Sequence, residues 1–451
     1  MNAFARTCAY CVAALLVLGT GSLAQESELP VIPPERKSAG LTDEDKSAVD
    51  KYVKYWTEAI GSANSAEQVV QARRRLGEGF DSGGTQGVAF KDYYVERVAV
   101  HAKTLLSAKI PATDPRKLLK EVNLSMAVLR MPQMPIQPLV EAMVAHENPA
   151  VRYFGWSSFA RLRGPMLSEG LSTVQKLYPL LTKAAADESD RYVLGVVIGV
   201  LRLPPRPANV DETDYQELRK KFLAILQAHW TKRCRQVLAG DAAASEPLRA
   251  GVTVVGSLTQ ALGGSAERKA SLQMVMNMAW SAAKTFDMTE QLGQVMKAAQ
   301  KAIQQADDPT ATEADKAAAK AAVAKIKEHA AKLGRASADV SDILAAYDQS
   351  LTDLTLLLLK CEEVLNTLTK KSEADRPLSY IEKPLLRSST PGQRGAELRL
   401  GVMKWTDKLV KEHGLKRPDQ VVPAPAPTPA PKTKPAPAPK TKPATAPAAG
   451  G

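Results

Sequence analysis

Helix-start patterns recur along residues 41–286, and alternating apolar and polar runs typical of strands are nearly absent. Thr42 with Asp45, and Ser65 with Gln68, have the spacing of side chains that cap the first turn of a helix. Helical periodicity continues over 88–108, 213–239, 246–262 and 266–286. The sequence therefore predicts an all-α fold.

A glycine-rich stretch, residues 77–87, separates the second predicted helix from the third. It lacks the Lys-Ser/Thr pair of a phosphate-binding loop. We interpret it as an ordinary loop between helices.

Two helix starts carry a capping side chain directly before proline, at Asp114-Pro115 and Asn148-Pro149, 34 positions apart. The second follows an apolar helix predicted at 136–145. It resembles a HEAT repeat through Asn148, Pro149, Val151, Arg152, Gly155, Phe159 and Leu162.

The resemblance implies that the Asn-Pro turn caps the second helix of a pair, that Val151 packs inward and that Arg152 runs along the stack. Weaker units begin at Asp114 and cover 177–201, so the resemblance extends over roughly 115–265. Because a helix pair buries its apolar face only against stacked neighbours, residues 41–286 are expected to form an α-solenoid. The candidate partner-binding face is Arg152, Tyr153, Trp156 and Arg161, with Trp156 alternatively a core residue.

A second pattern occupies residues 287–372. From Val340 to Leu368, apolar residues step by four and three without interruption, the spacing of a coiled-coil seam. Shorter seams run over 292–306 and 319–333, so we expect three long helices in a coiled-coil-like hairpin or bundle. The alternative is a continuation of the solenoid with longer helices. Residues 373–415 form a closing segment with a helix predicted at 391–413.

The N-terminus has the order of a secretory signal peptide: Arg6, an apolar run, then Ser22 and Ala24 at a small-residue cleavage site. We expect residues 1–24 to be removed after Ala24 and residues 25–40 to form a flexible leader. The alternative is an uncleaved anchor, but the apolar run is shorter than the roughly 20 residues of a spanning helix. After cleavage no transmembrane helix is expected, and the protein is predicted to be secreted or periplasmic.

The C-terminal segment, residues 416–451, is predicted to be disordered, and beyond Val422 it has no apolar side chain larger than Ala or Pro. Its alternating prolines favour an extended polyproline II conformation. It is either a soluble spacer or a binder of an anionic envelope polymer. Its cations are Lys432, Lys434, Lys440 and Lys442.

The net charge of +12 is spread over the chain, and no basic groove indicates specific nucleic-acid binding. Only Cys234 and Cys361 remain in the mature chain. Both fall on apolar helix faces, which favours buried thiols over a disulfide. The Met274, Met276 and Met278 group is interpreted as ordinary packing.

The five histidines lie on separate predicted helices or helix ends, without a second His or Cys at metal-ligand spacing. Nucleophile-elbow and dinucleotide-binding motifs are also missing from the sequence. We therefore predict no cofactor and no catalytic residues. The expected function is that of a non-catalytic protein-interaction scaffold of the cell envelope or periplasm, whose protein partner the sequence does not identify. The alternatives are a polyanion binder acting through the tail and an enzyme of unrecognised class.

Overall fold

The structure is a computed structural model of the whole chain, and it describes residues 40–82, 87–111, 113–240, 245–306, 308–332, 340–369, 380–387 and 393–423. The predicted signal peptide and nearly all of the predicted leader lie outside the described residues. So does the tail beyond Pro423, with Lys432, Lys434, Lys440 and Lys442.

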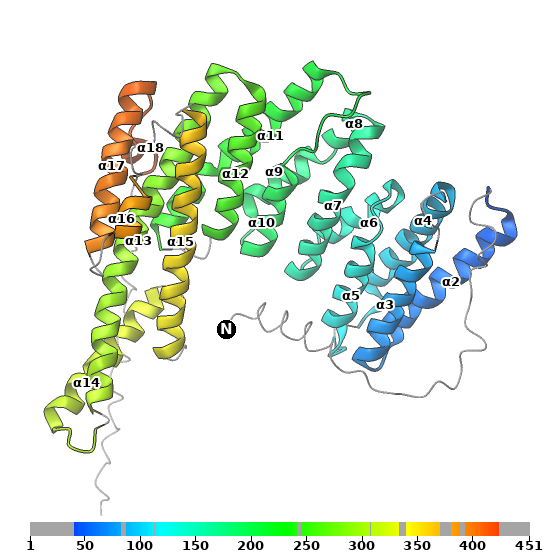
Figure 1. Cartoon of the computed structure of the whole chain (residues 1–451). Coiled ribbons are helices and arrows are strands. Elements are labelled where there is room, and N and C mark those ends of the chain that lie inside the picture. The colour runs from blue at the N-terminus through cyan, green and yellow to red at the C-terminus, as the bar shows by residue number, and fades with distance from the viewer. Residues whose placement is uncertain are drawn as a thin grey trace, which may run out of the picture.

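The described residues form an all-α, solenoid-like helical-repeat fold without a strand. Figure 1 shows the helices side by side in a row that runs from α2 to α17. The predicted fold class is confirmed. The helices are α2 (Asp43–Ser62), α3 (Ala66–Asp81), α4 (Val88–Thr104), α5 (Lys117–Leu129), α6 (Gln137–Val144), α7 (Pro149–Glu169), α8 (Leu171–Gln175), α9 (Tyr178–Asp187), α10 (Arg191–Val200), α11 (Glu212–Leu238), α12 (Ser245–Leu262), α13 (Ser265–Ala306), α14 (Glu313–Lys332), α15 (Val340–Leu368), α16 (Glu382–Arg387), α17 (Gln393–His413) and α18 (Pro418–Val421).

The first two predicted helix starts are confirmed as capping boxes. The Thr42 hydroxyl accepts a hydrogen bond from the Asp45 backbone N–H (3.2 Å), and the Asp45 carboxylate accepts one from the Thr42 N–H (3.0 Å). Ser65 and Gln68 repeat this reciprocal arrangement at the start of α3. Each pair satisfies N–H groups that the helix itself leaves without partners.

The loop predicted at 77–87 is wrong in its first half, because α3 continues to Asp81. Gly79 is a buried helix residue, and a Cβ atom built on it would lie 2.6 Å from the hydroxyl oxygen of Tyr94. That hydroxyl donates a hydrogen bond to the carbonyl of Leu76 (2.8 Å). Glycine here permits the close approach of α3 and α4, so its role is packing and not chain reversal.

The Asn148-Pro149 turn joins α6 to α7. The Asn148 side chain caps α7 by accepting a hydrogen bond from the Ala150 N–H (2.9 Å). A Cβ atom built on Gly155 would lie 2.9 Å from the Val144 backbone nitrogen, so a small residue lets the two helices pack closely. Membership of the HEAT family stays a prediction. Of the residues that carry the resemblance, Val151, Phe159 and Leu162 are fully buried.

The helices predicted separately at 266–286 and 292–306 are one continuous helix, α13, of 42 residues. The predicted boundary between residues 286 and 287 therefore falls inside a helix. Helix α13 packs against α11, α12, α14, α15 and α17. Because helices surround it, Met274, Met276 and Met278 are all buried despite their spacing of two, as the packing interpretation predicted.

The second half of α13 (residues 288–306), α14 and the first part of α15 (residues 340–353) form what we call the arm, which projects below the row of helices in Figure 1. Its small apolar cluster of Met296, Ile326 and Tyr347 is separate from the main core, which runs from Val49 to Val422. The arm is thus held by far fewer buried side chains than the solenoid.

The predicted seam of α15 is confirmed over its second half, where it packs against α12 and α13. The side chains of Val340 and Leu344, at its start, lie outside the described residues. The buried seam residues of this second half are Leu354, Leu358, Cys361, Leu365 and Leu368, and Tyr347 is buried in the arm.

Helix α17 closes the row by docking antiparallel on α13. The buried Glu290 carboxylate accepts hydrogen bonds from Arg394 Nε (3.0 Å) and from the Gly395 backbone N–H (2.6 Å). One helical turn away, Asp287 pairs with Arg399 (3.2 Å). Two buried carboxylates therefore fix the start of α17.

Cys234 and Cys361 are free and fully buried, as the sequence predicted. Burial raises the pKa of Cys234 to about 12 and that of Cys361 well above its usual value. None of the described helices combines the length and the apolar character needed to cross a membrane.

Candidate interaction site

The side chain of Arg152, the first residue of the predicted face, is engaged within the fold. Its guanidinium forms two hydrogen bonds to the Glu188 carboxylate, from Nε to Oε2 (2.9 Å) and from Nη2 to Oε1 (3.0 Å). Nη1 donates to the carbonyls of His146 (3.1 Å) and Glu147 (2.7 Å). Arg152 therefore ties the α6–α7 turn to the turn that follows α9.

The other predicted residues do not form one exposed face with Arg152. Trp156 is only 2% exposed and packs on Phe159, so its alternative assignment to the core is the correct one. Arg161 is exposed but donates to the Leu129 carbonyl (3.2 Å). Tyr153 is half-buried and lies edge-on to a neighbouring ring. The structure gives this set no shared binding surface.

The contact of Arg161 recurs elsewhere in the fold: a cationic side chain from one helix donates to the last backbone carbonyls of another helix. Arg163 Nη1 donates to the Gly199 and Val200 carbonyls at the end of α10, and Arg268 Nε donates to the Leu368 carbonyl at the end of α15. Such contacts satisfy carbonyls without helical partners and oppose the negative end of the helix dipole. Lys120 and Arg233 act in the same way on Gly61 and Ala185.

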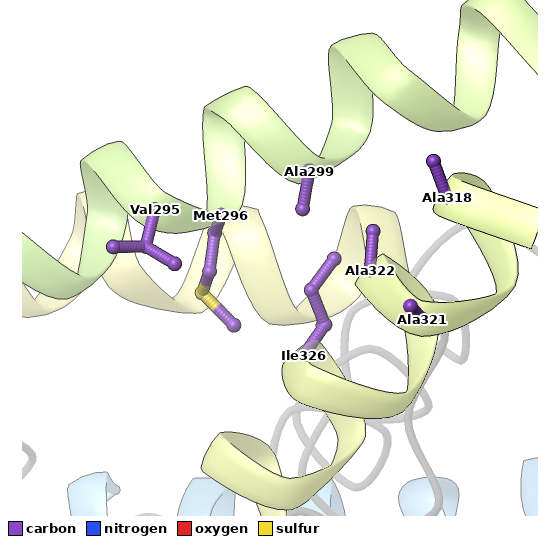
Figure 2. Close-up of a pocket in the computed structure, with 7 residues that line it drawn as sticks. All are labelled: Val295, Met296, Ala299, Ala318, Ala321, Ala322 and Ile326. Carbon is purple, nitrogen blue, oxygen red and sulfur yellow. The ribbon is translucent and has the colours of Figure 1, made fainter. Parts of the chain in front are cut away.

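The arm carries a hollow of about 360 Å³ between α13 and α14. Figure 2 shows side chains from both helices around this shared space. Every lining residue is aliphatic or a thioether: Val295, Met296 and Ala299 from α13, and Ala318, Ala321, Ala322 and Ile326 from α14.

The composition of α14 explains the hollow. Three of its four lining side chains are alanine methyl groups, which are too short to fill the space in front of α13 at normal interior density. Val295 remains 49% exposed beside this space. The hollow contains no titratable group, so it offers apolar contact and no acid–base or nucleophilic chemistry.

Several exposed apolar side chains lie on α13 or on helices that pack against it. Among the described residues, most of the large exposed ones lie on the mutually packed helices α13, α15 and α17. These residues are Met288, Val295, Leu356, Leu359, Leu400 and Met403.

A hydrogen-bonded group of one acidic and two basic side chains lies elsewhere, between α2 and α4. Asp50 Oδ1 accepts from Arg97 Nε (2.5 Å) and lies 3.0 Å from His101 Nε2. Burial opposes ionisation of Asp50, but the hydrogen bonds from His101 and Arg97 outweigh it and lower its pKa. Across the described part of the chain, no cluster of three or more His, Cys, Asp or Glu side chains is suited to hold a metal ion.

Comparisons with protein-family models, curated proteins and solved structures give no match to this chain. The class of protein is therefore defined by its architecture: a solenoid-like row of helices that carries a long-helix arm.

Proposed function

We propose that this protein is an exported, non-catalytic interaction scaffold that binds a protein partner through the hollow on its arm. The observation that carries the proposal is the open apolar space lined by Val295, Met296 and Ala299 on one side and by α14 on the other. The partner would insert apolar side chains there, because the lining offers dispersion contacts and no polar ones.

In this proposal the arm binds the partner, and the solenoid supports the arm. The solenoid uses its cations for internal caps, such as Arg152 and Arg163, and buries Trp156. Among the described residues of the arm, the buried cluster is the small one around Met296. A partner that fills the hollow would add buried surface where the protein itself has least.

The test compares two identical substitutions on α14. Ala322 lines the hollow, whereas Ala324 is exposed and does not. Ala322→Glu places a carboxylate in the apolar space, and Ala324→Glu adds the same charge to the same helix outside it. Proteins that co-purify with the wild-type chain from envelope extract are quantified by mass spectrometry.

We expect a partner that is retained by Ala324→Glu and lost with Ala322→Glu, while circular dichroism shows both variants equally helical. Equal retention by the two variants would contradict the proposed site.

A further inference from the structure

A second groove lies in the middle of the row of helices, between the α8–α9 turn and α11. It has a volume of about 310 Å³. Buried Phe222 and Leu218 are at its base, and half-buried Tyr178 and exposed Pro179 lie on its rim. Gln175 and Lys221 add exposed hydrogen-bond donors.

This combination suits a polyproline II segment. Such a helix has no internal hydrogen bonds, so its carbonyls are free to accept from side-chain donors, and its proline rings pack on aromatic surfaces. Half-buried Tyr178 supplies aromatic surface above the buried Phe222, while Gln175 and Lys221 supply donors beside it.

The described chain ends at the same edge of the row of helices. Lys416 exchanges two hydrogen bonds with Gln273 near the start of α13, and the following α18 packs on that helix. Val422 is buried, and Pro423 is exposed. Figure 1 shows α8 and α18 toward the same edge.

Contacts between neighbouring helices connect the groove with the end of the described chain at Pro423. Gln216 of α11 donates to the Ala261 carbonyl at the end of α12 (3.3 Å), and Lys220 of α11 interacts electrostatically with Glu267 in the first turn of α13. Neighbouring helices are about 8–10 Å apart, so the groove lies roughly 30 Å from Pro423.

The tail is long enough to cover this distance. Its second uncharged proline–alanine stretch, Pro435–Pro439, begins twelve residues after Pro423. At about 3.1 Å per residue, that span is roughly 37 Å.

We propose that the tail folds back and docks Pro435–Pro439 into this groove of the same chain. The docked tail would cover the exposed faces of Tyr178 and Pro179. The proposal concerns a different surface from the arm, so it does not depend on the proposed partner.

The test measures the distance between two spin labels in the full chain by pulsed electron paramagnetic resonance. Genetically encoded labels at positions 183 and 441 leave the four native cysteines unmodified. Lys183 is exposed on α9 beyond the groove, and Thr441 follows the docking stretch. Tyr178→Ser removes an aromatic ring from the groove, and Tyr55→Ser is the control on a distant, 44% exposed tyrosine.

We expect one narrow distance population in the wild-type chain and in Tyr55→Ser. It should be lost in Tyr178→Ser and when Pro435, Pro437 and Pro439 are all replaced by serine. A broad distribution in the wild-type chain would overturn the proposal, as would a narrow one that survives Tyr178→Ser. A narrow population that disappears on dilution with unlabelled chain would assign the groove to the tail of a second copy. Binding of an added proline-rich peptide to a wild-type chain with a broad distribution would assign it to a partner. Either result would also overturn intramolecular docking.

Discussion

Arg152 and Glu188 lie 36 residues apart and join two successive helix turns through a two-point guanidinium–carboxylate contact. The Glu188 side chain is 7% exposed, and Glu188 Oε1 also accepts from the Asp190 N–H (2.9 Å), at the start of α10. The pair therefore couples the packing of one helix pair to the capping of the next. This makes it a structural link and not part of a free binding face.

Replacing Arg152 with alanine should destabilise the fold by about 3 kcal/mol, because it leaves a buried carboxylate without its counter-ion. Arg161→Ala is the matched control. Arg161 is exposed and donates a hydrogen bond to the Leu129 carbonyl (3.2 Å), so its loss should cost about 1 kcal/mol or less. Urea denaturation measures the free energy of unfolding of both variants. Equal losses would contradict a stabilising role of the Arg152–Glu188 pair.

Two glycines of α7 provide a second comparison. Gly155→Ala should destabilise by about 1–3 kcal/mol, because the new methyl group would lie 2.9 Å from the Val144 backbone nitrogen. Apart from its chain neighbours, Gly164 has open space at the same atom, so Gly164→Ala should cost about 1 kcal/mol or less, a cost set by the clash of a Cβ with the ring of Pro165. A thermal melt that ranks the two variants in the opposite order would show that α6 and α7 are not packed this closely.

The acid dependence of stability should reflect Asp50. Its folded pKa is lowered below the ordinary 3.8, so its charged form contributes stability above that value and the contribution is lost as pH falls through the folded pKa. Asp50→Asn should therefore be less stable at pH 7 by about 1 kcal/mol or less, as expected for partly exposed pairs, with the difference vanishing at acid pH.

Asp92 is the control, because its pKa is shifted in the opposite direction: burial raises it. Asp92→Asn should cause no loss of stability at pH 7. Denaturant titrations from pH 2 to pH 7 distinguish the two, and a loss in Asp50→Asn that persists at pH 2 would refute the ionic origin.

The docking of α17 should depend on Glu290. Glu290→Gln keeps the shape of the side chain but removes the charge that Arg394 and the Gly395 N–H contact. We expect a loss of about 2 kcal/mol and roughly tenfold or faster amide exchange in α17. Glu397→Gln changes an exposed carboxylate on the same helix and should leave the exchange unchanged. Identical amide-exchange rates in α17 of both variants would contradict a role of Glu290 in docking this helix.

Much of the fold could be predicted from local sequence. The Thr42 and Ser65 caps and the α15 seam depend on residues within one or two helical turns, which the sequence displays directly. The interruption predicted near residue 287 was wrong because Asp287 and Glu290 look like the solvent-exposed residues of a helix end. They are instead buried, and their partners Arg399 and Arg394 lie more than 100 residues away.

The glycine-rich stretch was misread for the same physical reason. Glycine signals a turn locally, but Gly79 is required by the approach of Tyr94 from another helix. The arm hollow was also missed, since an alanine-rich helix such as α14 gives no sign of whether its neighbour fills the space in front of it. The one available clue was the run of small residues at Ala318, Ala321 and Ala322 opposite larger ones on α13.

The export of the protein is tested by its mature N-terminus. Cleavage after Ala24 would give a chain that begins at Gln25. N-terminal sequencing of protein from the envelope fraction should find this residue. A retained Met1 in that fraction would contradict the proposed signal peptide.

The most direct test of the interaction scaffold is photo-crosslinking in intact cells with a benzophenone amino acid at position 295. Val295 is 49% exposed at the hollow, and Val88, 63% exposed on α4, is the control position. The proposed function predicts a discrete crosslinked product from position 295 that is missing from position 88 and abolished by Ala322→Glu. No product at position 295, or the same products from both positions, would contradict binding through the arm.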